Sequence, residues 1–145
     1  MYLLSLDDLC GEQPLCWRAF TPCSADGRSR LRDEIQQLLD DSNLSGAIAD
    51  LVAMLGVVLA RPAGPRMYQG VLKRCHEAVA GAQIYEFIKG PLRLYWFYGE
   101  DRQVIIVPAV YHKKQQKTPK EIVQMLRRAQ QEYREGHRQG SLTYL

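Results

Sequence analysis

The sequence lacks the features of a membrane or secreted protein. Its one long apolar run, residues 44–60, reads LSGAIADLVAMLGVVLA. This run is short for a membrane span and contains Asp50, so we expect a largely buried helix rather than a transmembrane one. The first residues have neither a basic start nor the long apolar core of a secretory signal. We therefore expect a cytoplasmic protein with no membrane partner.

Disulfide and metal-binding patterns are also missing. The four cysteines, Cys10, Cys16, Cys23 and Cys75, form no C-x-x-C pair and match no common zinc spacing. No cluster of Asp, Glu and His indicates a metal site. We expect reduced thiols that pack in the fold or lie at the surface, and no metal or other cofactor. Zinc binding by the first three cysteines is the alternative.

Charge is distributed unevenly along the chain. With 145 residues and a net charge of +3, we expect one domain with a real core. Residues 1–60 carry 4 basic and 9 acidic side chains, whereas residues 61–145 carry 15 basic and 7 acidic ones. A basic half favours a polyanionic partner, and a merely solvated basic face is the alternative.

Three runs rich in β-branched and aromatic residues predict strands in the second half of the chain. They are IYEFI, LRLYWFY and VIIVPAVY, at residues 84–88, 92–98 and 104–111. The short breaks GP and GEDR favour antiparallel hairpins. Pro108 lies inside the last run, so that strand needs either an edge position or a β-bulge.

The first half predicts a strand and two helices. Residues 17–20 read as a strand, and residues 30–39 as an amphipathic helix with Ser29 as its N-cap. The apolar run described above forms the second helix. Residues 67–80 are ambiguous: residues 71–80 suit either a short helix or an irregular link into the sheet.

A third helix is predicted after the last strand. Thr118 is the expected N-cap, Pro119 the first helical residue, and Glu121 completes a capping box. Apolar residues recur at helical spacing up to Tyr133, and Gly136 marks the expected end. The apolar face is expected to pack on the sheet.

These elements predict an α+β domain. We expect a small antiparallel β-sheet, with the two helices of the N-terminal half on one face and the other face partly open, and a C-terminal helix. Residues 1–16 are expected to be a leader segment, either a docked helical turn or a frayed end. The folded domain is expected to span residues 17–136, and residues 137–145 to be a loose tail.

Several motifs follow one another in an order typical of one toxin family. After the last strand come an aromatic residue, a lysine pair, a Thr-Pro step and a helix with basic residues: Tyr111, Lys113, Lys114, Thr118, Pro119, Glu121 and Ile122. The stretch IYEFIKGPLRLYWFY supplies a strand pair that carries Arg93, and DGRS at residues 26–29 supplies a turn. Over residues 17–135 this order resembles the RelE/ParE superfamily of bacterial toxins, specifically its HigB-like, phage-associated branch. The chain departs from the pattern at Ile88 and Ala109, where that branch often carries arginine and histidine.

The resemblance implies a RelE-like fold and the toxin of a type II toxin–antitoxin system. Such toxins cleave mRNA, often on the ribosome, and are restrained by a cognate antitoxin protein. Metal-free cleavage uses the 2′-hydroxyl as nucleophile, so it needs a base, an acid and cations around the phosphate. The resemblance implies Arg93, Tyr111, Lys113 and Lys114 as catalytic residues, and His112, which follows Tyr111 directly, is a further catalytic candidate. Three other lysines are expected to bind RNA by their charge: Lys89, Lys117 and Lys120.

Each expected site residue has a chemical role and a plain structural alternative. Arg93 offers a planar fork for phosphate, or else pairs with Glu86 across the hairpin. Lys113 and Lys114 lower each other's pKa if they share a site, but neighbouring strand residues point to opposite faces. Tyr111 stacks on a base, delivers a proton or packs on the sheet, and His112 suits acid–base work or is a plain surface residue.

Two other functions stay open on the same scaffold. One is a non-enzymatic inhibitor of a topoisomerase, like some ParE proteins; the constellation of Arg93, Lys113 and Lys114 argues against it. The other is a nucleic-acid-binding module, although no helix-turn-helix pattern supports direct reading of DNA.

Overall fold

The protein is an α+β fold built on one seven-stranded sheet. The computed structural model describes residues 1–68, 71 and 74–145. The helices are α1 (Arg30–Leu39), α2 (Ser45–Leu59) and α3 (Lys120–Gln139), with short 3-10 turns η1 (Asp7–Cys10) and η2 (Gly64–Tyr68). The strands are β1 (Tyr2–Ser5), β2 (Arg18–Cys23), β3 (Cys75–Val79), β4 (Ile84–Lys89), β5 (Leu92–Tyr98), β6 (Val104–His112) and β7 (Thr143–Tyr144).

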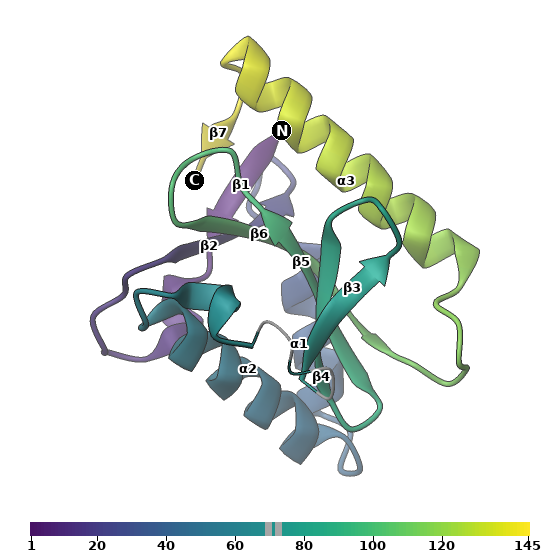
Figure 1. The fold of residues 1–145 in the computed structure, drawn as a ribbon. Helices are drawn as coiled ribbons and strands as arrows, with labels where there is room; N and C mark the ends of the chain where they lie inside the picture. Colours follow the sequence, from purple (N-terminus) through teal and green to yellow (C-terminus); the bar gives the residue numbers. More distant parts are fainter. Residues whose placement is uncertain (69–70, 72–73) are drawn as a thin grey trace.

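The sheet is mixed and larger than the small antiparallel sheet we expected. Its strand order is β3-β4-β5-β6-β2-β1-β7 (Figure 1). The pairs β2–β6 and β1–β7 are parallel, and the other neighbours are antiparallel. The difference arises because short strands at both ends of the chain, and β3, join the strands that the sequence indicates.

Helices cover both faces of the sheet (Figure 1). On one face, α1 and α2 bury side chains such as Leu31 and Leu55 against Phe87 and Trp96. On the other face, α3 packs beside the β5 and β6 side chains, with Tyr133 fully buried. The second face is therefore covered along α3, which reaches the β3–β4 turn: Gln130 donates a 2.9 Å hydrogen bond to the Ala82 carbonyl.

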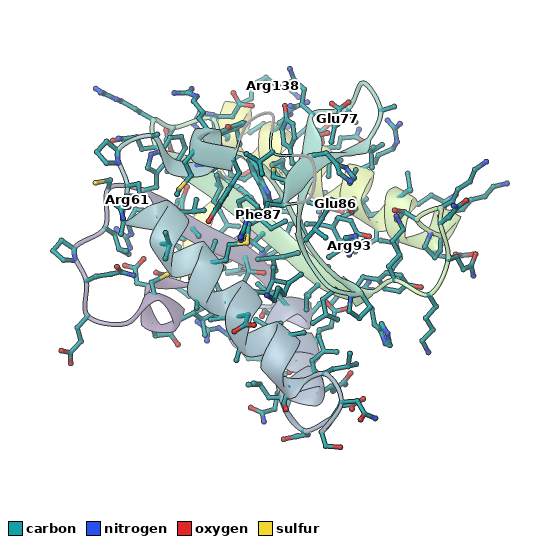
Figure 2. All side chains as sticks on the ribbon, turned by 60° about the horizontal axis from the view of Figure 1, so that its bottom comes forward. Arg61, Glu77, Glu86, Phe87, Arg93 and Arg138 are labelled. Atoms are coloured by element: carbon teal, nitrogen blue, oxygen red, sulfur yellow. The ribbon has the colours of Figure 1, made fainter. Side chains whose placement is uncertain are left out.

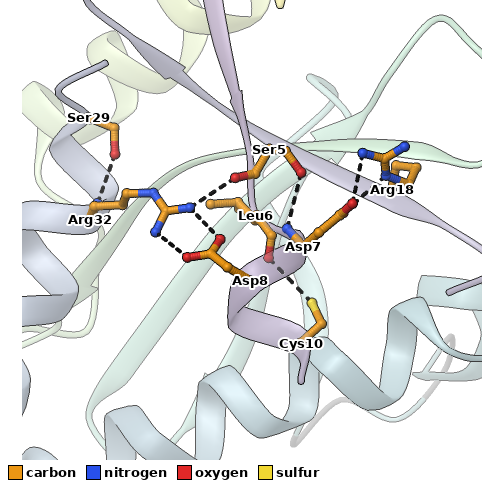
Figure 3. A network of polar contacts seen from close by, with 8 residues as sticks. All are labelled: Ser5, Leu6, Asp7, Asp8, Cys10, Arg18, Ser29 and Arg32. Atoms are coloured by element: carbon orange, nitrogen blue, oxygen red, sulfur yellow. Dashed lines mark hydrogen bonds and ion pairs between the residues drawn. The ribbon is translucent and has the colours of Figure 1, made fainter. Parts of the chain in front are cut away.

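The first residues belong to the sheet, although we expected a leader there. Strand β1 lies between β2 and β7, and η1 follows it as a helical turn. Figure 3 shows how this segment is fixed: the Arg32 guanidinium of α1 donates 3.0 and 2.6 Å hydrogen bonds to Asp8 and a 2.9 Å bond to the Ser5 carbonyl. Arg18 of β2 pairs with Asp7 at 2.8 Å. The run YLLS was too short and too weakly patterned to predict as a strand.

The two N-terminal-half helices confirm the sequence prediction. Helix α1 has the expected bounds, and the Ser29 hydroxyl accepts a 3.0 Å hydrogen bond from the Arg32 amide. Helix α2 buries Ile48, Leu51 and Leu55. None of the helices in the described residues is long and apolar enough to cross a membrane. Strand β2 runs past the expected end, through Pro22 to Cys23.

Within the described part of residues 71–80, for which we expect either a short helix or an irregular link, most residues form a strand instead. Residues 67–68 belong to η2, and residues 75–79 form the edge strand β3. Residues 69–70 and 72–73 lie outside the described residues. Strand β3 is paired antiparallel to β4 across a bulge, and this pairing brings a histidine to the site described below.

The three predicted strands and their hairpins are confirmed. Strands β4, β5 and β6 pair in order and antiparallel. Pro108 sits on a central strand, and the β5–β6 register shifts there: Tyr95 pairs with Ala109, but Phe97 pairs with Ile106. The extra residue on β6 is the bulge that the proline required.

Helix α3 differs from the prediction at both ends. Pro119 is the N-cap, with no side-chain cap hydrogen bond, so the expected capping box through Thr118 is not formed. The helix continues past Gly136 to Gln139 and ends at Gly140 in the left-handed conformation. The tail is not loose, because Thr143 donates a 2.9 Å hydrogen bond to the Met1 carbonyl and forms β7 beside β1.

Candidate active site

Polar side chains gather on the α3 face of the sheet, beyond the part that α3 covers. Strand pairing places them in two rows. In the first row, His76 of β3 is opposite Glu86 of β4, which is opposite Tyr95 of β5. In the second row, Arg93 of β5 is opposite Tyr111 of β6. Residues two apart on a strand share a face, so the two rows form one surface.

Glu86 lies at the centre of this surface. It is only 1% exposed, and Figure 2 shows it close to Arg93. Its Oε1 lies 3.2 Å from Nε2 of His76 and 3.8 Å from Nε of Arg93. Its Oε2 has no hydrogen-bond partner among the described residues. A buried carboxylate is costly unless it is paired. The sheet therefore holds a buried carboxyl group with only one oxygen in contact with polar partners, between two side chains that can carry positive charge.

Burial raises the pKa of Glu86 above its ordinary value, and the positive charges of His76, Lys113 and Arg93 only partly oppose this rise. Next to it, burial raises the pKa of Tyr95 to about 12. The Tyr95 hydroxyl also has no hydrogen-bond partner among the described residues. Perturbed ionisable groups that adjoin one another are a common mark of a functional site.

We expect Glu86→Gln to stabilise the protein increasingly as the pH rises. Because the folded-state pKa of Glu86 is raised, its contribution to stability is present below its unfolded pKa and is lost as the pH rises through the folded value. Glutamine is neutral at every pH, so the variant does not lose stability in this way as the pH rises. Urea unfolding at pH 4, 6 and 8 measures the free-energy difference between the variant and the wild type.

The matched control is Glu132→Gln, an exposed glutamate on α3, for which the difference should stay near zero at every pH. A Glu86→Gln variant that is less stable than the wild type at pH 8 would show that the ion pairs outweigh the cost of burial.

Arg93 is held in place by backbone oxygens as well as by Glu86. Its Nη1 donates hydrogen bonds of 2.7 Å to the Gly90 carbonyl and 3.0 Å to the Leu92 carbonyl. Its side chain is 17% exposed. The ion pair with Glu86, the structural alternative from the sequence, is thus present. The guanidinium is still partly exposed at the surface, and these contacts hold the side chain in one conformation.

The two lysines of the expected pair are separated. Lys113 acts electrostatically on Glu86, and its amide donates a 2.8 Å hydrogen bond to the Pro91 carbonyl beside β5. Lys114 and His112 instead line a cavity of about 370 Å³ against Glu34 of α1, and Tyr111 also borders this cavity. The two lysines therefore have different surroundings and do not form one joint site.

The expected RNA-binding lysines are dispersed. Lys89 pairs with Asp50 of α2 at 3.5 Å. Lys117 and Lys120 are exposed in the loop before α3 and at the first residue of that helix. Of the residues predicted from the sequence, the structure brings together Arg93, Tyr111 and Lys113, and places His112, Lys114 and Lys89 elsewhere.

Two members of the cluster were missed or undervalued at the level of sequence. Glu86 entered only as a partner for Arg93, although alternation in IYEFIK already places it on the face of Ile84 and Ile88. No local signal marked His76, because β3 was not predicted. Within the described residues, no three His, Cys, Asp or Glu side chains come together as a metal site.

Comparisons with known proteins give no family assignment. A scan against protein-family models finds no match, and a search of the curated proteins finds no relative. Function must therefore be argued from the site itself and from the sequence resemblance.

Proposed function

We propose that the protein is an endoribonuclease that cleaves mRNA, with a RelE-like fold and the role of a toxin in a toxin–antitoxin pair. The observation that carries the proposal is the convergence of His76, Arg93, Lys113 and Tyr111 around buried Glu86 on one sheet face. This set contains a base, acids and fixed cations, which are the groups that RNA cleavage through the 2′-hydroxyl requires.

The base in this proposal is His76. Its side chain is 38% exposed, while its Nε2 contacts the buried Glu86 carboxylate and its Nδ1 lies 3.2 Å from the Glu77 carbonyl. In this proposal Nε2–H donates to Glu86, and Nδ1 leaves the exposed Glu77 carbonyl when RNA binds. Nδ1 then takes the proton from the 2′-hydroxyl as the 2′-oxygen attacks phosphorus. Glu86 then stabilises the imidazolium that forms and holds the ring in place, so it is a positioning residue rather than one that touches RNA.

The acid and the cations come from the second row. As the 2′-oxygen–phosphorus bond forms, the phosphorus–5′-oxygen bond breaks, and the leaving oxygen needs a proton. Lys113 supplies that proton; it follows directly after β6, two residues from Tyr111. Arg93 lies between Glu86 and Tyr111 and balances the charge that develops on the phosphate oxygens.

The two positions at which the chain departs from the family pattern lie next to residues of this surface. Ala109 is the register partner of Tyr95, and Ile88 is the partner of Arg93. Strand pairing gives a row that begins at His76 and ends at Ala109, with Glu86 and Tyr95 between them. We propose that this chain has moved its imidazole from β6 to β3, so the missing family histidine does not mean a missing base.

An antitoxin and the ribosome are the proposed partners. Half-buried Lys113 and the exposed Lys117 and Lys120 follow β6 in the chain, and an inhibitor that brings acidic and apolar groups would complement this basic stretch. A message held on the ribosome would present a single strand with its 2′-hydroxyl accessible.

Translating ribosomes incubated with the protein test this function directly. New message ends, mapped by primer extension, are the expected result. Messages that remain intact while growth stops would support the topoisomerase alternative, and nucleic-acid binding without cleavage would support the binding module. A strain that grows normally during verified expression of the folded protein would contradict the toxin role.

A further inference from the structure

A second pocket lies at the other end of β5, away from Glu86. It has a volume of about 410 Å³, and its walls come from Trp17, Tyr98, Arg66 and the β5–β6 turn. Along β5 it is five residues from Arg93, or roughly 17 Å at strand spacing, and Tyr98 packs on the α1–α2 side of the sheet. The pocket is therefore separate from the candidate active site.

Aromatic rings form the inner part of this pocket. Trp17 is 4% exposed, and its ring centroid lies 6.0 Å from that of Tyr98. Its indole nitrogen donates a 3.0 Å hydrogen bond to the Pro62 carbonyl, and Gly64 packs so closely that a Cβ there would lie 2.4 Å from the ring. Trp17 therefore forms a fixed inner wall. Tyr98 is half-buried, with ring centroids of Tyr85 and Trp96 at 5.8 and 5.1 Å, and the side of its ring that lines the pocket is the part that a ligand can reach.

Two arginines supply the charge. The Arg66 guanidinium lies 5.9 Å from the ring centroids of both Trp17 and Tyr98. Arg102 comes from the β5–β6 turn, and both arginine side chains are exposed. Asp101 also lines the pocket, but its carboxylate lies 3.2 Å from Nε2 of His137. The pocket therefore favours an anion, and Gln103 adds an amide that can bond to the edge of a base.

We propose that this pocket binds a nucleoside monophosphate unit, with the base against Tyr98 and the phosphate between Arg66 and Arg102. The volume falls in the range of small-molecule sites. An aromatic wall beside guanidinium groups is the chemistry that binds nucleotides without sequence preference. The unit comes either from a free nucleotide or from a nucleotide within a single strand, and both share this chemistry. The proposal does not require that the protein cleaves RNA.

The test is calorimetric titration of the full-length protein with adenosine monophosphate, inorganic phosphate and adenosine. Adenosine monophosphate should bind, and more tightly than either part alone. Arg66→Ala and Arg102→Ala should each weaken binding at least tenfold, as loss of a charge-assisted phosphate contact does. The Trp17 indole N–H signal in NMR spectra should shift on binding. Arg61→Ala is the control, because this exposed arginine lines a different cavity, and its affinity should match the wild type.

A short single-stranded RNA distinguishes the two sources of the nucleotide. Tighter binding of the RNA than of adenosine monophosphate, lost with Arg66→Ala, identifies the pocket as a site for a strand. Equal affinities identify a free nucleotide. An adenosine monophosphate affinity that Arg66→Ala and Arg102→Ala leave unchanged, or no binding at millimolar ligand, would overturn the proposal. If adenosine monophosphate binds as expected but the protein does not cleave RNA, only the proposed function is refuted.

Discussion

Replacing His76 with alanine is expected to lower the rate of RNA cleavage by about 100- to 10,000-fold, the usual contribution of a general acid or base. The reason is that His76 is the group of the cluster that combines surface exposure with a carboxylate at 3.2 Å. Single-turnover cleavage on programmed ribosomes gives the rate, and thermal melting shows that the fold is kept.

The chain contains a close match for the control. The His137 side chain is 37% exposed, and its Nε2 also lies 3.2 Å from a carboxylate, that of Asp101. His137 belongs to α3, however, and is far along the chain from the cluster. His137→Ala should therefore cleave at the wild-type rate. If the two alanine variants cleave equally fast, His76 is not the base, and the Glu86 pair is structural.

The second large effect concerns the cations. Arg93→Ala and Lys113→Ala are each expected to lower the cleavage rate by about 100- to 1000-fold, because each removes a fixed positive charge from the phosphate site. Lys114→Ala should change the rate little, since Lys114 and His112 line the cavity against α1 on the other side of the sheet. The same assay measures all three rates.

Lys114 is the matched control for Lys113, being the same residue type one position away. Arg93→Lys separates charge from geometry: it keeps the charge but loses the planar fork, so its rate should fall between those of the wild type and alanine. Equal losses for Lys113→Ala and Lys114→Ala would contradict the division of the lysines between two faces and restore the joint site expected from the sequence.

Most of the regular structure could be predicted from local pattern. Residues 30–39 carry a helical apolar repeat and a serine cap, and β4 to β6 carry β-branched and aromatic runs with short breaks. Pro108 even indicated the bulge in β6. In these places local preference and tertiary packing agree, so the sequence is sufficient.

The missed strands share a physical cause. Strands β1, β3 and β7 are short, and each is stabilised by hydrogen bonds to a strand or terminus that local sequence does not reveal. Thr143, for example, pairs beside residues at the opposite end of the chain. No window of neighbouring residues contains that information, because the partner decides the conformation.

The candidate site was only partly predictable for the same reason. Alternation along β4 and β5 places Glu86 and Arg93 on one face, and this could be read locally. The approach of His76 depends on the register between β3 and β4, and β3 itself was not predicted. Lys113 and Lys114 lie just after β6, and their different neighbours follow from the positions of the β4–β5 hairpin and α1.

The central claim is that this surface cleaves RNA through the neighbouring 2′-hydroxyl. The most direct test is single-turnover cleavage of a message that carries one 2′-deoxynucleotide at a previously mapped cut. The unmodified message should yield a 2′,3′-cyclic phosphate and a 5′-hydroxyl, and the deoxy message should stay intact at that position. Cleavage of the deoxy message at the same position, or products with a 5′-phosphate and a 3′-hydroxyl, would contradict the account.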